Sequence, residues 1–137
     1  MKRLITAALV ASTLAGGALA QDYSLRFQSS DPAGNPNFQL QTRWTEMVAE
    51  KTGGKVAIEL LPVESIVAHN ETQDAIAAGI LDGHVTDTSY FSGKDPAFGL
   101  IANPVGAWSA PEEMFTFMRT GGGNELMQGL LEPYGLH

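Results

Sequence analysis

The sequence from Glu50 to Pro62 reads EKTGGKVAIELLP and contains the end of a helix, a turn and a complete strand. Lys51 suits the last turn of a helix, and Gly53-Gly54 can take the left-handed backbone that ends it. Apolar residues then occupy every second position before the proline stops the strand: Val56, Ile58 and Leu60. A helix that leads into a strand in this way is typical of α/β proteins.

The preceding residues predict the strand and helix that come first. Residues 23–28 alternate apolar and polar side chains, as a half-buried strand does. Asn35-Pro36 then provides an N-cap and a first helical residue. The helix that follows carries one apolar stripe: Leu40, Trp44, Met47 and Val48.

The residues after Pro62 repeat this alternation. A helix over residues 70–81 begins at a capping-box-like pair, Asn70 and Gln73, and residues 84–90 read as a third strand. Strand, helix, strand, helix and strand predict a mostly parallel sheet with right-handed crossovers.

The last forty residues predict helices and an incomplete end. Residues 98–108 read as irregular, and the S-x-x-E pair Ser109 and Glu112 predicts the start of a helix. A glycine run ends that helix, and a short last helix is expected over residues 124–131. Residues 133–137 read as the approach to another strand, so we expect the chain to be the truncated N-terminal portion of a larger protein.

The first twenty residues predict a signal peptide. Lys2-Arg3 precedes an apolar run, and Ala18-Leu19-Ala20 provides a cleavage site before Gln21. The run is too short to span a bilayer, and the sequence has no cysteine to acylate. We therefore expect export to the periplasm by the Sec route, with residues 21–137 as the mature chain and no direct membrane insertion of it.

The charge of the mature chain disfavours several partners. Removal of residues 1–20 takes away two of eight basic residues and none of fifteen acidic ones, which leaves a formal charge of −9. Such a domain repels nucleic acid and anionic lipid. Without cysteines, its stability must come from a hydrophobic core.

Known catalytic and metal-binding motifs are missing. The sequence contains no G-x-G-x-x-G, P-loop, H-E-x-x-H or G-x-S-x-G motif. His69 and Glu71 are too close for a helical ligand pair, and His84 opens a predicted strand. We therefore expect a protein that is not an enzyme, with no catalytic residue and no metal site in this chain.

The geometry of a parallel sheet still predicts a binding edge. Ligands bind beyond the carboxyl ends of the strands, where Gln28–Asp31, Pro62–Ser65 and Ser89–Ser92 would meet. Tyr90 is expected to reach the solute and Phe91 to pack in the core, because successive strand residues point to opposite faces. The candidate ligand-binding residues are Gln28, Ser29, Tyr90 and Phe91.

Several motifs resemble one transport family. Glu50–Val56 with Glu59–Pro62 resembles the helix-to-strand signature of solute-binding proteins of TRAP (tripartite ATP-independent periplasmic) transporters, the DctP-like proteins. Asp74–Gly83 is similar to the next helix and turn of that family. Gly93–Phe98, with Pro62–Val67, resembles the branch that binds 2-oxo and related monocarboxylates.

The resemblance implies a fold and a function. It implies a two-lobed periplasmic receptor, with a first lobe like that of type II periplasmic binding proteins and helices on both faces of its sheet. Such a receptor captures a small carboxylate and delivers it to the membrane permease subunits of a TRAP transporter, driven by an ion gradient. The arginine that clamps the carboxylate, and the residues that hold a possible cation beside the ligand, then lie outside this chain. Glu64 departs from the branch, where a glycine or other small residue is common.

Two alternatives remain open at this point. An exported hydrolase whose catalytic half is missing would also begin with a signal peptide and an α/β layer. A receptor that feeds an ATP-driven importer would share the fold class.

Overall fold

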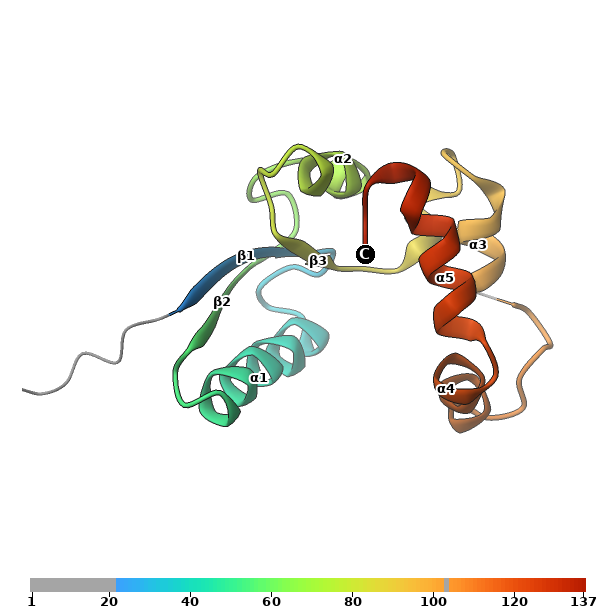
Figure 1. Ribbon diagram of the computed structural model, residues 1–137, viewed down its shortest axis with the longest axis horizontal. Helices are drawn as coiled ribbons and strands as arrows, with labels where there is room; N and C mark the ends of the chain where they lie inside the picture. The colour runs from blue at the N-terminus through green and yellow to red at the C-terminus, as the bar shows by residue number, and fades with distance from the viewer. Residues whose placement is uncertain (1–21, 103) are drawn as a thin grey trace, which may run out of the picture.

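The computed structural model describes residues 22–102 and 104–137. The predicted signal peptide, residues 1–20, lies outside the described residues. The described chain forms a sheet with a helix on each face and, beside it, a second group of helices (Figure 1). Within these residues, no helix has both the length and the apolar character needed to cross a membrane.

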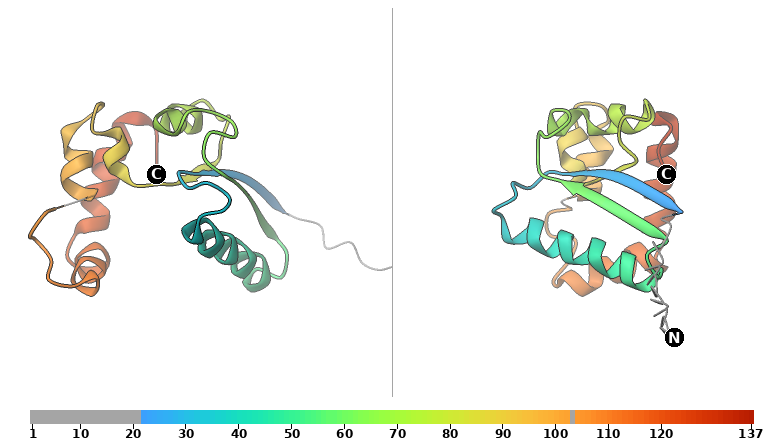
Figure 2. Two further views of the ribbon diagram at one scale, coloured as in Figure 1. Left: turned by 180° about the vertical axis from the view of Figure 1, so that it is seen from behind. Right: turned by 90° about the vertical axis from the view of Figure 1, so that its left-hand side faces the viewer.

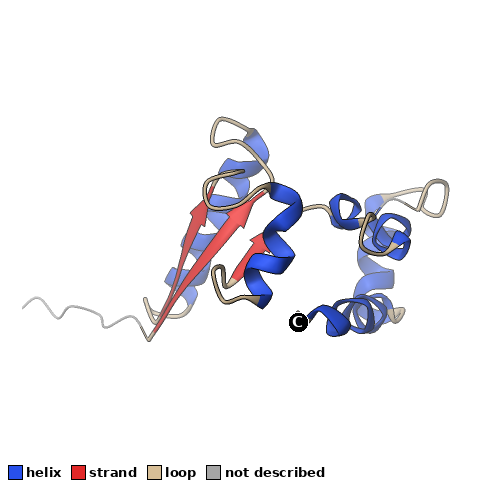
Figure 3. Cartoon of the chain, turned by 90° about the horizontal axis from the view of Figure 1, so that it is seen from above, coloured by secondary structure: helices blue, strands red, loops and turns tan. Residues whose placement is uncertain are grey.

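The sheet contains three parallel strands. They are β1 (Tyr23–Ser29), β2 (Val56–Leu61) and β3 (Gly83–Val85), in the order β2-β1-β3 (Figure 3). β1 therefore lies in the centre, and both of its neighbours come later in the chain. This arrangement confirms the predicted α/β class and the parallel pairing.

α1 (Pro36–Lys51) covers one face of the sheet and follows its prediction closely. The side chain of Asn35 accepts a backbone hydrogen bond from the first helical turn at 2.8 Å. The helix ends before Gly53, whose φ of 62° is the left-handed conformation expected there. Trp44 packs against Phe27 of β1, with ring centroids 6.1 Å apart.

α2 (Thr72–Ala77) lies on the opposite face of the sheet (Figure 2) and is shorter than the predicted helix. A 3-10 turn, η1 (His69–Glu71), leads into it, and no side chain caps either element. The predicted capping pair is therefore wrong. The helix is shorter than predicted because Gly79, which was expected inside it, adopts a φ of 70° and ends it.

β3 is also shorter than the predicted strand over residues 84–90. The chain leaves the sheet after Val85, because the side chain of Asp87 accepts a hydrogen bond from the Ser89 N–H at 2.8 Å. This cap starts a second 3-10 helix, η2 (Thr88–Phe91). Tyr90 and Phe91, at the end of η2, therefore lie on a short helix and not on a strand.

The second group of helices begins in a stretch predicted to be irregular. α3 (Pro96–Ala102) starts where the side chain of Asp95 accepts a hydrogen bond from the Ala97 N–H at 2.8 Å. An aspartate before a proline provides an N-cap and a first helical residue. The prediction of irregular structure is therefore wrong for residues 98–102, whereas residues 104–108 lie outside helices and strands as predicted.

The last elements are helical as well. α4 (Pro111–Thr120) and α5 (Gly123–Leu131) begin without a side-chain cap, so the predicted capping box at the start of α4 is wrong. Glu113, one residue beyond the predicted partner, accepts a hydrogen bond from the Ser109 N–H at 2.8 Å. Residues 133–137 were predicted to approach another strand, but the first two of them belong to the 3-10 helix η3 (Glu132–Tyr134).

A row of aromatic side chains joins the sheet to the second group of helices. Phe91 and Phe98 are 1% and 0% exposed, and their ring centroids lie 6.2 Å apart. Phe91 also contacts the ring of His84 at 5.4 Å, and Phe98 contacts Tyr134 at 5.8 Å. Burial of these rings fixes η2 against the sheet.

Candidate functional site

Segments that follow the three strands meet at the carboxyl edge of the sheet. The N–H of Ser30 donates to Val85 O at 2.9 Å, and the N–H of Val63 donates to Asp31 O at 3.0 Å. The turns after β1, β2 and β3 are thus held together by backbone hydrogen bonds. We refer to residues 29–31, 62–69 and 86–91 as the carboxyl edge.

Gln28 lies beneath this edge. Its side chain is 0% exposed. Its Nε2 donates to Val67 O at 2.9 Å, while its Oε1 accepts from the N–H groups of Ile66 and Val67 at 2.9 and 3.2 Å. The amide therefore positions the loop after β2. Its predicted contact with a solute stays a prediction.

Ser29 is also buried, with 1% of its surface exposed. Its Oγ donates to Gln41 Oε1 at 2.6 Å and accepts from the Asp31 N–H at 2.9 Å. The Gln41 Nε2 in turn donates to Asp31 Oδ2 at 2.8 Å. This closed set of hydrogen bonds joins the turn after β1 to α1, and a solute contact by Ser29 stays a prediction as well.

Tyr90 and Phe91 differ in exposure, although both lie on η2 and not on the strand whose alternation predicted the difference. Tyr90 is 48% exposed, whereas Phe91 is 1% exposed and packs in the aromatic row. The structure therefore leaves the Tyr90 ring accessible at the carboxyl edge. Gln28 and Ser29 lie at the end of β1 beside the same edge, so all four candidates come from adjoining segments.

A cluster at the edge was not predicted from the sequence. The rings of His69 and Tyr90 meet edge to face, with centroids 4.8 Å apart and an interplanar angle of 73°. The Nδ1 of His69 lies 3.9 Å from Oε1 of Glu64. Glu64 has a φ of 60°, which residues other than glycine adopt rarely. His69 and Tyr90 are twenty-one positions apart in the sequence, so no local motif could show their contact.

Two basic side chains near the sheet, Lys94 and Arg26, are engaged with partners. Lys94 pairs with Asp74, and its Nζ lies 5.6 Å from the centroid of the Tyr134 ring. Arg26 Nε lies 3.4 Å from Glu59 Oε2. Over residues 22–102 and 104–137, no group of three or more acidic or histidine side chains is arranged to hold a metal ion.

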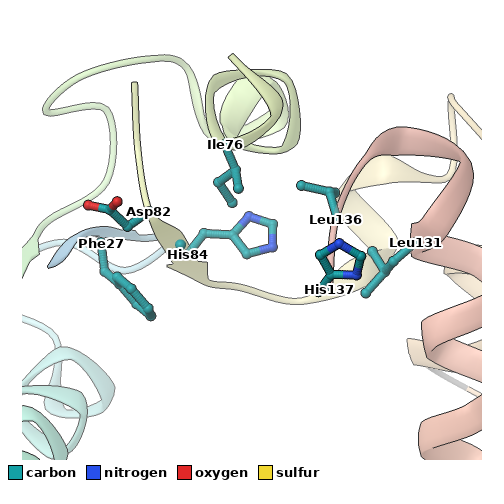
Figure 4. Close-up of a pocket in the computed structure, with 8 residues that line it drawn as sticks. Phe27, Ile76, Asp82, His84, Leu131, Leu136 and His137 are labelled. Carbon is teal, nitrogen blue, oxygen red and sulfur yellow. The ribbon is translucent and has the colours of Figure 1, made fainter. Parts of the chain in front are cut away.

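A cavity of about 180 Å³ lies beside β3, away from the carboxyl edge (Figure 4). Figure 4 shows the His84 ring pointing into it below Ile76, with His137 on the far side. The Nδ1 of His84 is 2.8 Å from Thr72 Oγ1. Burial lowers the pKa of His84 to about 4, so this imidazole is neutral at neutral pH. The His84 ring therefore offers no cation to an organic acid in this cavity.

Several solved structures similar to this chain are TRAP solute-binding proteins. A crystal structure of a TRAP periplasmic solute-binding protein from Rhodobacter sphaeroides, in an apo open state, is 63% identical, with a TM-score of 0.80 over 82% of this chain and 36% of that chain. A TRAP solute-binding protein from Bordetella bronchiseptica, with calcium and picolinate, is 18% identical, with a TM-score of 0.74 over 82% and 33%. One from Pseudoalteromonas atlantica, with sodium and pyruvate, is 24% identical, with a TM-score of 0.70 over 82% and 34%.

These matches differ in what they establish. The two structures below 25% identity show the fold alone, and the chain spans about a third of the length of all three. The family and these neighbours are solute-binding receptors, not enzymes. The sequence profile of DctP, described as bacterial extracellular solute-binding protein, family 7, matches residues 27–132. The chain therefore belongs to the DctP family of TRAP solute-binding proteins.

Proposed function

We propose that this chain is the N-terminal portion of a periplasmic receptor that captures a small organic acid and delivers it to an ion-gradient-driven TRAP permease. The observation that carries the proposal is the family match over residues 27–132, together with the Rhodobacter sphaeroides relative at 63% identity. Residues 1–20 would be removed after Sec-dependent export, and residues 21–137 would form part of the first lobe.

The carboxyl edge supports a polar, anionic solute. Tyr90 leaves its ring accessible there, and its hydroxyl can donate a hydrogen bond to a carboxylate or 2-oxo oxygen. The named ligands of several structural neighbours are carboxylic acids: pyruvate, pyroglutamic acid and orotic acid. A 2-oxo or hydroxy monocarboxylate is the solute class that we propose.

Two basic residues of this portion do not supply a free cation for the solute carboxylate. Lys94 and Arg26 are paired with carboxylates, so neither is free to replace the hydration of a solute anion. A bidentate cation for the carboxylate would come from the second lobe. Sodium or calcium in neighbouring structures supports a cation beside the ligand of the complete receptor.

The test uses a complete receptor. We define the hybrid receptor as residues 22–137 of this chain followed by the part of the Rhodobacter sphaeroides relative that lies beyond the matched segment. Isothermal titration calorimetry with pyruvate, pyroglutamate and orotate should give micromolar binding of at least one acid. Residues 21–137 alone should bind pyruvate negligibly.

The outcome separates two explanations. Binding of an acid by the hybrid receptor, lost when Tyr90 is replaced by alanine, supports a solute site at the carboxyl edge. A folded hybrid receptor that binds none of the three acids would contradict the proposed class of solute.

A further inference from the structure

We propose that Glu64 makes the receptor selective for solutes with a single negative charge, because its carboxylate repels the second carboxylate of a dicarboxylic acid. This inference rests on the proposed function, since it concerns the same edge and the same class of ligand. It adds to that edge the residue that discriminates between monoanions and dianions.

The first support is the backbone of Glu64. Its φ of 60° is a conformation that glycine and asparagine adopt more easily, and among the described residues it is the only residue other than glycine with a positive φ. Glu64 occupies the third position of a turn in which the Ser65 N–H donates to Pro62 O at 3.3 Å. Backbone strain of this kind gathers at binding sites, where the side chain has a use that glycine could not serve.

The second support is the anchoring of this turn on both sides. Before Glu64, the Val63 N–H donates to Asp31 O at 3.0 Å. After it, Gln28 Oε1 accepts a hydrogen bond from the Ile66 N–H at 2.9 Å. The backbone therefore holds the Glu64 side chain at a fixed place on the carboxyl edge.

The third support is the short path from the Glu64 carboxylate to the accessible aromatic ring. Glu64 Oε1 lies 3.9 Å from His69 Nδ1, and the centroids of the His69 and Tyr90 rings lie 4.8 Å apart. The Glu64 side chain is 66% exposed, and Tyr90 is 48% exposed. A solute that contacts the Tyr90 ring on this side therefore lies within about 10 Å of the carboxylate, the range over which charges interact at ordinary ionic strength.

The fourth support is the balance of charges at the carboxyl edge. Residues 29–31, 62–69 and 86–91 contain no lysine or arginine. Their other two carboxylates accept hydrogen bonds, Asp31 from Gln41 Nε2 and Asp87 from the Ser89 N–H, both at 2.8 Å. Among the described residues, no hydrogen bond reaches the Glu64 carboxylate. Its negative charge is therefore exposed to an approaching solute, and it repels two negative charges more strongly than one.

The experiment compares two three-carbon acids in the hybrid receptor, pyruvate with one negative charge and malonate with two. Isothermal titration calorimetry is carried out at about pH 8.5, where histidine side chains are generally uncharged. The unsubstituted receptor should bind pyruvate more tightly than malonate. Glu64→Gln, which keeps the length of the side chain, should lower the ratio of the two affinities about fivefold, mainly because malonate binds more tightly.

Two further variants accompany this comparison. Glu46 is exposed on α1, so Glu46→Gln has the same net charge as Glu64→Gln and, as the matched control, should leave the ratio unchanged. Glu64→Gly covers the case in which Glu64→Gln does not fold, because glycine adopts the φ of 60° without steric cost. It should lower the ratio to the same extent.

The possible outcomes separate this inference from the proposed function. An unchanged ratio in the Glu64 variants, or an equal fall in Glu46→Gln, would overturn the inference while leaving the proposed function intact. Malonate binding that stays undetectable in every variant, or a lack of pyruvate binding, would overturn it as well. A folded hybrid receptor that binds neither pyruvate, pyroglutamate nor orotate would overturn both.

Discussion

The two faces of the sheet differ in what they bury. On the α1 side, three apolar side chains are largely in contact with solvent: Leu40 (63% exposed), Trp44 (41%) and Met47 (51%). On the side of α2 and its preceding loop, three polar side chains are buried: Gln28 (0%), Gln73 (1%) and Thr72 (3%). The usual distribution of polar and apolar groups is reversed at these six positions.

The difference teaches how each face contributes to the molecule. Exposed apolar surface gains free energy from any cover of suitable shape, because the hydrophobic effect has no direction. Buried amides and hydroxyls are most stable when their hydrogen bonds are satisfied in one geometry, as those of Gln28 and Thr72 are. Gln73 is the exception on this face, because neither polar atom of its side chain has a hydrogen-bond partner among the described residues. The contacts of Gln28 therefore fix the loop after β2. On the α1 side, the hydrogen bonds of Ser29, Gln41 and Asp31 fix the turn after β1, and the exposed apolar side chains do not.

The largest effect is expected from the aromatic row under the α2 face. Phe91→Ala in the hybrid receptor should lower the free energy of unfolding by about 3–5 kcal/mol, because a buried ring is replaced by a cavity. Urea denaturation measures this change. Tyr90→Phe, at the neighbouring exposed position, should leave the stability nearly unchanged. If Phe91→Ala lowered the free energy of unfolding by less than about 1 kcal/mol, the aromatic row would not be what joins the sheet to the second group of helices.

The next effect concerns pH. The pKa of His84 falls from 6.5 to about 4 in the folded protein because burial disfavours its charged form. The unfolded state then binds more protons than the folded state between these two pH values. The contribution of His84 to the free energy of unfolding is therefore fully present above pH 6.5 and is lost as the pH falls towards 4.

The change should reach about 3 kcal/mol of unfolding free energy at the acid end of this range. Denaturant titrations at a series of pH values would measure it. His84→Gln should flatten this part of the profile, and His137→Gln should preserve it. An unchanged slope in His84→Gln would assign the acid sensitivity to another group.

A smaller effect is expected from the amide beneath the carboxyl edge. Gln28→Leu leaves the backbone groups of Ile66 and Val67 without their side-chain partner, at a cost of about 1–3 kcal/mol. Gln39→Leu, on the exposed surface of α1, is the matched control. If Gln28 instead contacts the solute, affinity would fall in Gln28→Leu while stability stayed the same. That result would assign this buried polar group to binding.

The smallest effect on stability is expected on the α1 face. Leu40→Lys should change the free energy of unfolding by no more than about 0.5 kcal/mol, because the side chain is already exposed. The same change should reduce self-association of residues 21–137, which sedimentation velocity would detect. A loss of about 2 kcal/mol or more in the hybrid receptor would show that the second part of the receptor covers this face.

The elements that follow a local pattern could be predicted from the sequence. α1 and β2 follow from apolar spacing, an N-cap and a glycine pair, all within a few residues of one another. The parallel sheet follows from the order of strands and helices. The boundaries of α1 and β2 depend on residues that are close to them in the sequence, so local patterns are enough to predict these boundaries.

Other features depend on a single backbone conformation. Gly79 could have been inside a helix or at its end, and only its φ of 70° decides between them. Asp87 forms a side-chain cap where the sequence indicated a strand, and Asp95 forms one just before the stretch that was predicted to be irregular. Aspartate suits both situations, so composition alone could not choose.

The candidate site was predicted in part. Its three segments meet as expected, but β1 continues through Ser29, which places Gln28 and Ser29 inside the sheet and not on the loop after it. The contact of His69 with Tyr90 depends on the packing of two short 3-10 turns. Such packing has no signature in one sequence.

The central place of β1 has a consequence for the order in which this chain can fold. Its pairing partners lie 33 residues later in β2 (Tyr23 with Val56) and 56 residues later in β3 (Phe27 with Gly83). A nascent chain that emerges from its N-terminus exposes β1 first, yet neither edge of that strand can be satisfied until much more chain has followed. Long-range parallel pairing of this kind is slow to form. That delay would suit the proposed Sec-dependent export, in which the polypeptide stays unfolded while it passes through a translocation channel.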